Sequence, residues 1–415
     1  MAPVTRNIGL SLGADICWPI CFEEMMKRMN LNIRWKGDTV SFHVERVSIE
    51  PFNLRQEVKY DLVVDRLTHW YHTSREWLKK GILMDGLYVF NNPWSIQANE
   101  KHTSYAAMMA LGMPIPETWM VPPKAYSSEL VDVRATLRSY AKLFDLGQVG
   151  AQVGYPHFMK PYDGGGWRAV SRVTDEKSLK ANYDKSGTQV MHLQAAVHPF
   201  DRFVRMVGFG PQTRAVLYNP DAPLHDRYTM EKEADFLTPK ERKTLEDTLL
   251  TINAFFGWEF NSCESLRGAD GTWYPIDFAN PCPDSQVTSL HYHFPWLVKS
   301  YLRWTIYCAA TKRKMRKTLD WEPYYEVAAT DRSYEEKLAE YGRISRKRLE
   351  ADKFEEFCAK HLGNLDEVAW EFFGTDEAKD AVRKKVAALF PAHEVEQFTE
   401  LFWKRIQHWR AEQKS

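Results

Sequence analysis

The stretch FMKPYDGGGWRAV, residues Phe158–Val170, decides the fold that we predict for this chain. A short apolar run ends at Lys160, three consecutive glycines follow, and a second apolar run begins after Arg168. Three glycines leave backbone N–H groups without side-chain cover, so these groups can approach anionic oxygens, and a lysine adds positive charge. The stretch predicts a β-hairpin over a phosphate-bearing ligand, with a plain flexible turn as the alternative.

The composition sets limits on the class of protein. With 415 residues the chain predicts two to three domains, and 44% hydrophobic residues are ordinary for a soluble globular protein. Lys+Arg and Asp+Glu both number 55, so the net charge of zero argues against non-specific nucleic-acid binding. We expect no nucleic acid and no membrane among the partners, because no apolar run is long enough to span a bilayer.

The six cysteines are scattered along the chain, which predicts free thiols in a reducing compartment and no disulfide framework. The first residues lack the apolar core of a signal peptide because Asp15 interrupts it. We therefore expect a cytoplasmic protein.

The first 95 residues alternate apolar and amphipathic segments, which predicts a small N-terminal α/β domain with a largely parallel sheet. Expected strands are 7–12, 39–49, 60–65 and 87–90, and expected helices are 17–29 and 70–80.

Residues 96–310 predict a second domain, divided at about 115–197 and about 198–310. Expected strands are 118–121, 157–160, 169–173, 190–196, 201–209, 213–218, 258–266 and 273–278. Expected helices are 98–111, 127–146, 174–187, 239–256 and 294–313.

Residues 311–415 carry more charge and few strand signals, which predicts a helical C-terminal extension. Its expected helices are 333–361, 365–373, 377–389 and 393–413. The basic run Lys312–Lys317 is either a phosphate patch or, as we favour, the solvated end of the preceding helix.

A second informative stretch runs from Trp258 to Asp284 and reads WEFNSCESLRGADGTWYPIDFANPCPD. It places Glu264 near the end of one predicted strand, and Asp277 and Asn280 near the end of its hairpin partner. Carboxylate and amide oxygens suit Mg²⁺ and metal-bridged phosphates. One such residue alone more often satisfies a turn, but three on one hairpin favour a metal site.

The order of these motifs resembles the ATP-grasp superfamily over about residues 61–284. YVFNNPWSIQANEKHTSYAAMMALGMPIPETW, residues 88–119, is similar to that family's entry into its ATP-binding region, and Lys101 matches the first nucleotide lysine. FMKPYDGGGWRAV is similar to the family's glycine-rich hairpin, and Lys160 matches the second lysine. VMHLQAAVHPFDRFVRMVGF, residues 190–209, resembles the strands and hinge that hold adenine.

The resemblance implies an α/β (α+β) chain with an ATP-grasp fold, preceded by the N-terminal α/β domain and followed by the helical extension. It implies ATP and two Mg²⁺ ions, with Mn²⁺ as an alternative. The implied ATP-binding residues are Lys101, Lys160, Gly164, Gly165, Gly166, Gln194, Ala195, Val197 and Asp201. The implied metal ligands are Glu264, Asp277 and Asn280.

Two strand arginines, Arg205 and Arg214, alternate inward with apolar neighbours. A buried arginine without a partner is costly, so each is a candidate to stabilise charge on a transferring phosphoryl group. An ordinary ion-paired arginine is the equal alternative for each.

One departure from the family concerns the acidic hairpin. The family usually ends its metal strand with Glu-x-Asn, whose residues share a strand face, whereas Asp277 and Asn280 are three apart. A bulge or turn would be needed to bring them together. Glu259 is an alternative to Glu264 as the metal-binding carboxylate on the first strand, and we rank it lower. For His291 and His293 we favour an acceptor-substrate pocket, or packing beside Trp296, over a transition-metal site. Asp284 and Ser285 are further candidates for that pocket.

The predicted activity is that of an ATP-dependent carboxylate–amine ligase. ATP would activate a small-molecule or peptide carboxylate as an acyl-phosphate, and an amine would displace phosphate. The alternatives are an ATP-grasp-type kinase and a catalytically impaired nucleotide-binding or scaffold protein. We leave a homodimer open.

Overall fold

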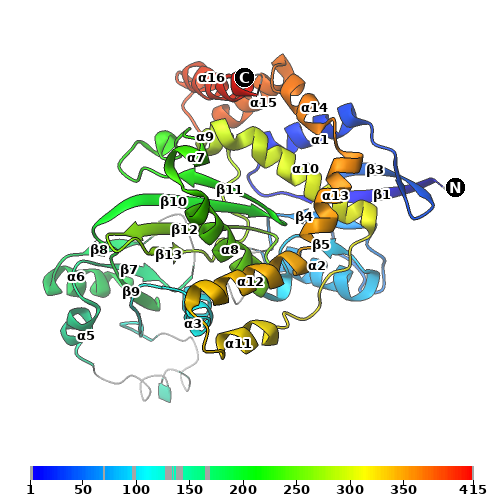
Figure 1. Ribbon diagram of the computed structural model, residues 1–415. Coiled ribbons are helices and arrows are strands. Elements are labelled where there is room, and N and C mark those ends of the chain that lie inside the picture. The colour runs from blue at the N-terminus through cyan, green and yellow to red at the C-terminus, as the bar shows by residue number, and fades with distance from the viewer. Residues whose placement is uncertain are drawn as a thin grey trace. The chain divides into compact units, whose positions relative to one another are not determined.

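The computed structural model describes residues 3–68, 71–95, 100–126, 133, 135–136, 144–163 and 169–413 (Figure 1). The chain forms two compact units. Unit 1 comprises Met1–Ile96, Val204–Ser262 and Pro281–Ser415, and unit 2 comprises Gln97–Phe203 and Cys263–Asn280. The structure confirms the predicted mixed α/β class. The predicted domain boundaries near 95 and 310 stay predictions, and most of the helix expected at 127–146 lies outside the described residues.

Unit 1 begins with a five-stranded sheet in the order β2-β3-β1-β4-β5. Its strands are β1 (Pro3–Ser11), β2 (Ile33–Trp35), β3 (Asp38–Arg46), β4 (Leu62–Asp65) and β5 (Tyr88–Val89). β1 pairs in parallel with β3 and β4, and β4 with β5, which confirms the largely parallel sheet. Ile8, Leu10 and Val63 are fully buried, as expected for strands covered on both faces.

The sequence prediction missed β2, which pairs antiparallel with β3. The two strands are joined by Lys36 and Gly37, both with positive φ. That backbone is typical of a two-residue hairpin turn. Because β2 has only three residues, it carries too little alternation to be recognised.

The first helix, α1 (Cys17–Met29), has the predicted bounds. Trp18, Phe22, Met25 and Met29 are buried at helical spacing, so one face packs inward. The Trp18 ring stacks on Tyr301, with 4.1 Å between ring centroids. Helix α2 (His72–Asp85) contributes Trp77, Leu78 and Ile82 to a core cluster that includes residues of β4 and β5.

The second sheet has the order β11-β10-β12-β13. Its strands are β10 (Phe200–Phe209), β11 (Gln212–Leu217), β12 (Phe260–Gly268) and β13 (Trp273–Asp277), and β10 and β11 form an antiparallel hairpin. Within unit 1, α8 (Pro239–Phe256) approaches β10 so closely that a Cβ on Gly208 would lie 2.6 Å from Asn253 Nδ2.

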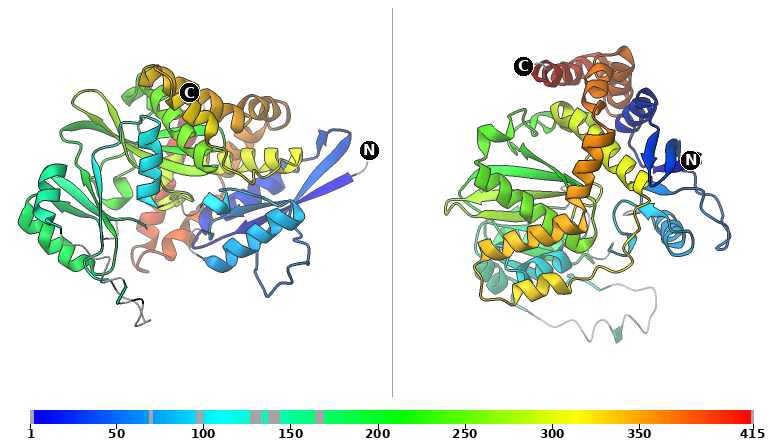
Figure 2. Two further views of the ribbon diagram at one scale, coloured as in Figure 1. Left: turned by 90° about the horizontal axis from the view of Figure 1, so that it is seen from below. Right: turned by 45° about the vertical axis from the view of Figure 1, so that its right-hand side comes forward.

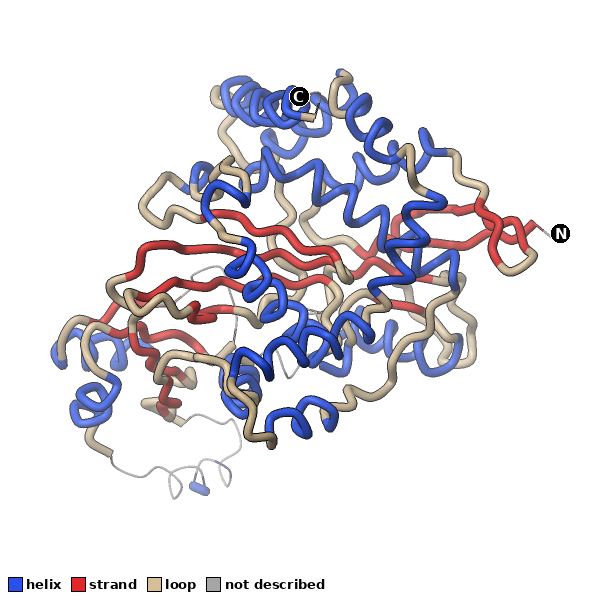
Figure 3. The backbone as a smooth tube through the Cα atoms, viewed as in Figure 1, coloured by secondary structure: helices blue, strands red, loops and turns tan. Residues whose placement is uncertain are grey.

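The C-terminal part of unit 1 is helical, as predicted (Figure 3). Its helices are α10 (Phe294–Thr311), α11 (Glu322–Ala328), α12 (Tyr334–Arg348), α13 (Ala351–His361), α14 (Leu365–Phe372), α15 (Asp376–Ala387) and α16 (Val395–Glu412). Helices α14 and α15 contact α1, so the end of unit 1 packs on its beginning (Figure 2).

One predicted helix is wrong: the segment 333–361 forms two helices. The first helix ends at Arg348 and the second begins at Ala351. Glu350, between them, has a positive φ of 53°. The break buries Leu349, and Phe354 and Phe357 of α13 are buried where α13 packs on α10. The periodicity continues across the break, so tertiary packing decides where the helix ends.

Unit 2 contains the third sheet, in the order β6-β9-β7-β8. Its strands are β6 (Thr118–Val121), β7 (His157–Pro161), β8 (Ser171–Val173) and β9 (Met191–Ala195), and each pair is antiparallel. Helices α5 (Leu146–Val153) and α6 (Glu176–Ser186) contribute Val153 and Leu179 to its core. Pairing of β7 with β8 confirms the two strands of the predicted hairpin.

No helix in the described ranges is long and apolar enough to cross a membrane.

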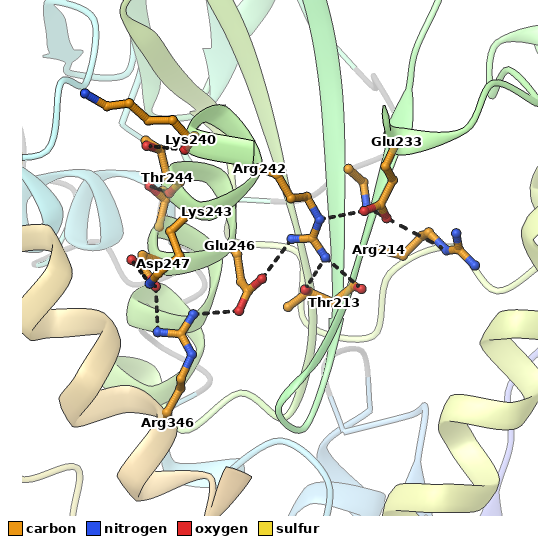
Figure 4. Close-up of polar contacts among 12 residues, drawn as sticks. Thr213, Arg214, Glu233, Lys240, Arg242, Lys243, Thr244, Glu246, Asp247 and Arg346 are labelled. Atoms are coloured by element: carbon orange, nitrogen blue, oxygen red, sulfur yellow. Dashed lines mark hydrogen bonds and ion pairs between the residues drawn. The ribbon is translucent and has the colours of Figure 1, made fainter. Parts of the chain in front are cut away.

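A network of ion pairs joins α8 to α12 and to α7 (Glu233–Phe236), as Figure 4 shows. Asp247, 4% exposed in its side chain, accepts from Lys243 at 2.6 Å and from Arg346 Nη1 at 2.7 Å. Arg346 also pairs with Glu246 at 2.6 Å. Gly342 of α12 lies against the Asp247 carboxylate and leaves no room for a Cβ.

The substitution Gly342→Ala tests this packing. Alanine normally stabilises a helix interior relative to glycine, by roughly 0.5–1 kcal/mol. Here we expect the added methyl group to displace Asp247 from two cations and to destabilise the protein by about 1–3 kcal/mol. Urea unfolding measures the change. The control is Lys347→Ala, at an exposed position of the same helix. Equal stability of wild type and Gly342→Ala would contradict the packing described.

Candidate functional site

Lys101 begins helix α3 (Lys101–Ala110) in unit 2. Its backbone N–H donates to the Tyr162 carbonyl at 2.8 Å, and its Nζ lies 3.0 Å from Asp277 Oδ2. One turn later on the same helix face, Tyr105 donates its hydroxyl to the Ile276 carbonyl at 2.7 Å. Tyr105 was not among the predicted site residues, although its i+4 spacing from Lys101 could have indicated it. Two side chains of α3 therefore contact the end of β13.

Lys160 lies on β7 and is 8% exposed. Its Nζ donates to Gln194 Oε1 at 2.8 Å and to the Ile276 carbonyl at 3.4 Å. Gln194 in turn donates to Thr118 Oγ1 at 3.1 Å, which fixes the amide. Burial lowers the pKa of Lys160 to about 8; the charge of Lys101 adds to this shift, while Asp277 and Glu264 oppose it.

Glu264 and Asp277 are directly opposite each other on β12 and β13, next to a register shift between Glu264 and Ser265. Cross-strand partners share a sheet face, and two like charges at such positions destabilise the pair. Lys101 and Lys160 both interact electrostatically with this part of the hairpin. Lys101, Lys160, Glu264 and Asp277 thus form one cluster of two positive and two negative side chains within unit 2, the lysine–carboxylate cluster.

Asn280 joins this cluster despite its spacing of three from Asp277. β13 ends at Asp277, so strand alternation does not govern residues 278–280. The Asn280 Nδ2 donates to Asp277 Oδ1 at 3.2 Å. The two side chains therefore lie together.

A metal ion would find a limited protein donor set here. In the described residues no group of three or more His, Cys, Asp or Glu side chains could hold a metal. Glu264 and Asp277 carboxylates with the Asn280 amide are nevertheless hard oxygen donors. Mg²⁺ is commonly held by one or two carboxylates together with substrate phosphates and water, so the set fits Mg²⁺.

For the other predicted ATP-binding residues, the contacts that follow are with residues outside the lysines and carboxylates described above. The Ala195 N–H donates to the Glu117 carbonyl at 2.9 Å, and Val197 follows shortly after β9. Asp201 pairs with Arg267 at 2.7 Å and its side chain is 55% exposed. Gly164, Gly165 and Gly166 lie outside the described residues.

Arg205 and Arg214 belong to unit 1, and each has protein partners there. Arg205 donates to Ser262 Oγ at 3.0 Å and to the Tyr228 hydroxyl. Arg214 lies 4.0 Å from Glu233 and 5.4 Å over the Trp296 ring, and burial lowers its pKa. These contacts are those of the ordinary alternative, and the catalytic assignment stays a prediction.

Glu259, the alternative metal-binding carboxylate, has its hydrogen-bond partners in unit 1. It accepts from the Trp304 indole at 2.8 Å and from the Tyr88 hydroxyl. Asp284 accepts from the Gln286 N–H at 2.8 Å, as a turn residue does. These contacts favour a structural role for both carboxylates.

No protein-family model and no curated protein sequence matches this chain. Among solved structures it is similar to D-alanyl-alanine synthetase A from Vibrio cholerae, at 14% identity and a TM-score of 0.48, over 74% of this chain and 98% of that one. It is similar to D-alanine–D-alanine ligase from Bacillus anthracis, complexed with ATP, at 12% identity and 0.44, over 82% and 99%. It is also similar to a RimK domain ATP-grasp protein from Sphaerobacter thermophilus, at 14% and 0.43, over 67% and 92%.

The lowered pKa of Lys160 predicts how the free energy of unfolding depends on pH. Its folded value, about 8, is below the ordinary value of 10.5, so between these pH values the unfolded chain binds more protons. The free energy of unfolding should therefore gain about 1–3 kcal/mol from this group as pH rises through that range. Urea unfolding of wild type and Lys160→Met at several pH values isolates the contribution. Lys177→Met, at an exposed position of α6, should keep the wild-type dependence. Parallel curves for wild type and Lys160→Met would contradict the prediction.

Proposed function

We propose that this chain is an ADP-forming carboxylate–amine ligase of the ATP-grasp type. The observation that carries the proposal is the cluster in unit 2, where Lys101 contacts Asp277 at 3.0 Å and Lys160 shares the electrostatic environment of Glu264 and Asp277. The same four residues were predicted from the sequence, the lysines from the resemblance to the ATP-grasp superfamily and the carboxylates from the acidic hairpin. A purely structural ion pair would explain Lys101 and Asp277, but it would not require a second buried lysine beside them.

The cluster suits a polyphosphate. Lys160 is charged at neutral pH although burial lowers its pKa to about 8, so an added anion would stabilise its charge. Lys101 and Lys160 come from a helix and a strand, and can hold phosphate oxygens from two directions. Bound Mg²⁺, held by Glu264, Asp277 and Asn280, would neutralise charge on the phosphate oxygens. Catalysis would then depend mainly on positioning and electrostatics.

In the proposed reaction a substrate carboxylate oxygen attacks the γ-phosphorus of ATP, and the bond to the β–γ bridging oxygen breaks to release ADP. The resulting acyl-phosphate is attacked at its acyl carbon by an amine nitrogen. The amide bond forms, the nitrogen loses a proton, and inorganic phosphate leaves. Arg205 or Arg214 would stabilise charge on the transferring group. Exclusion of water is needed because water would hydrolyse the acyl-phosphate.

The decisive experiment measures ADP, inorganic phosphate and product with full-length protein, ATP, Mg²⁺ and panels of carboxylates and amines. A ligase releases ADP and phosphate together and joins the two substrates. A stable phosphorylated product without free phosphate would identify a kinase instead. ATP binding without ADP formation for any pair would support the impaired-protein alternative, and absence of ATP binding would overturn the nucleotide site.

Substitutions in the acidic hairpin should separate chemistry from folding. We expect Asp277→Asn and Glu264→Gln to lower the rate of ADP formation by about a hundredfold or more, because each removes a carboxylate that would hold the Mg²⁺ ion that neutralises the phosphates. The matched control is Asp270→Asn, at the turn of the same hairpin, where Asp270 accepts from the Thr272 N–H at 3.0 Å. Thermal unfolding of all three verifies folding. Wild-type rates in both cluster variants would remove these carboxylates from the mechanism.

A further inference from the structure

The ammonium group of Lys101 contacts a carboxylate that the proposed metal site would use. Lys101 is the first residue of α3, which is labelled in Figure 1, and its Nζ donates to Asp277 Oδ2 at 3.0 Å. The Lys101 side chain is 6% exposed and that of Asp277 is 25% exposed, so salt and water screen this pair only in part. A cation of the protein itself therefore contacts one oxygen of a candidate metal ligand.

Both oxygens of the Asp277 carboxylate accept hydrogen bonds. Oδ2 accepts from Lys101, and Oδ1 accepts from the Asn280 amide at 3.2 Å. A divalent ion bound to this carboxylate would lie close to the Lys101 ammonium group, and like charges repel each other. Metal binding at Asp277 therefore costs free energy unless the ammonium group moves away from the carboxylate.

The two lysines of the lysine–carboxylate cluster differ in what their Nζ atoms contact. Asp277 Oδ2 is the only hydrogen-bond acceptor of Lys101 Nζ among the described residues. Lys160 Nζ instead donates to Gln194 Oε1 at 2.8 Å and to the Ile276 carbonyl at 3.4 Å. A buried ammonium group needs a partner, so Lys101 can leave Asp277 at low cost only for another anion. The phosphates of a nucleotide would be that anion.

We propose that Lys101 competes with the metal ion for Asp277, and that nucleotide phosphates end this competition by drawing the ammonium group away. The inference rests on the proposed function. The protein binds the metal ion weakly without nucleotide and more tightly once phosphates hold Lys101. Because coupling between two ligands is reciprocal, the metal ion raises the affinity for nucleotide by the same factor. Lys101 thus couples the two ligands in addition to holding phosphate oxygens.

Removal of Lys101 distinguishes competition from a purely structural ion pair by the sign of its effect on metal affinity. If the ion pair only held Asp277 in place, its loss would release the carboxylate and weaken metal binding. If Lys101 competes, its loss leaves Asp277 and the directly opposite Glu264 with less compensating charge. A divalent ion then binds this pair of carboxylates more tightly than in wild type.

The test titrates full-length protein with MnCl₂ in the absence of nucleotide and measures free Mn²⁺ by electron paramagnetic resonance. We expect Lys101→Met to bind Mn²⁺ about tenfold more tightly than wild type, or better, because a charge-assisted hydrogen bond no longer competes. Lys101→Arg keeps a cation at this position and should bind nearly as weakly as wild type. Equal or weaker binding by Lys101→Met would overturn the proposal, as would absence of Mn²⁺ binding by both proteins at millimolar concentration.

Two control variants show whether the effect depends on the contact with Asp277. Lys160→Met also removes a buried lysine of the cluster, but Lys160 Nζ donates to Gln194, so the gain should be smaller. Lys177→Met removes an exposed lysine of α6 and should leave Mn²⁺ binding unchanged. Thermal unfolding verifies that each variant folds. If Lys101→Met does not fold, Lys101→Gln replaces it, because an amide can donate to Asp277 without a charge. Equal gains in Lys101→Met and Lys160→Met would overturn the proposal.

Titrations with nucleotide separate this inference from the proposed function. A non-hydrolysable ATP analogue should raise the Mn²⁺ affinity of wild type more than that of Lys101→Met, since only wild type has the competing ammonium group to release. The analogue chelates Mn²⁺ in solution equally for both proteins, so the comparison cancels that contribution. If ADP forms but Lys101→Met gains no Mn²⁺ affinity, the competition fails and the ligase proposal stands. If Lys101→Met gains Mn²⁺ affinity while wild type binds no ATP, the competition for Asp277 stands, and its release by nucleotide fails with the ligase proposal.

Discussion

Two carboxylates that face each other across one hairpin repel, and the structure of unit 2 must place positive charge beside them. Glu264 and Asp277 are direct partners on β12 and β13, a position in which like charges repel. Nearby cations offset this repulsion, and in the described part of the chain the buried lysines Lys101 and Lys160 supply them. Burial of a lysine is itself costly, so each needs polar partners. The hydrogen bonds of Lys101 with Asp277, and of Lys160 with Gln194, meet that need.

The need to hold two buried lysines beside the carboxylates also explains the hydrogen bonds made by the residues around the cluster. Lys101 can reach Asp277 because its helix begins against the carbonyl of Tyr162 and is held again by Tyr105. Lys160 is fixed by an amide that is itself fixed by Thr118. In unit 1, Arg205 also has hydrogen-bond partners, namely Ser262 and Tyr228, and Arg214 lies 4.0 Å from Glu233, although its buried Nε has no hydrogen-bond partner in the described residues. Lys101, Lys160 and Arg205 therefore have hydrogen-bond partners before any ligand arrives.

Much of this could be predicted from the sequence because it depends on local patterns. Helix 17–29 has buried residues at helical spacing, and helix 239–256 has Thr238 as a capping residue and Pro239 in its first turn. The break at Glu350 could not be predicted, since it follows from how α13 packs on α10. The proximity of Asp277 and Asn280 was equally inaccessible, because it depends on where β13 ends.

The threading of the chain has a consequence for its synthesis. Unit 1 is assembled from three separate segments, the last of which begins at Pro281, whereas unit 2 ends at Asn280. Translation proceeds from the N-terminus, so every residue of unit 2 has been added before the last segment of unit 1 exists. Helix α1, whose Trp18 stacks on Tyr301, must wait with an uncovered apolar face until that segment is made. Such surface is prone to association, so the nascent chain exposes an apolar face that the complete protein covers.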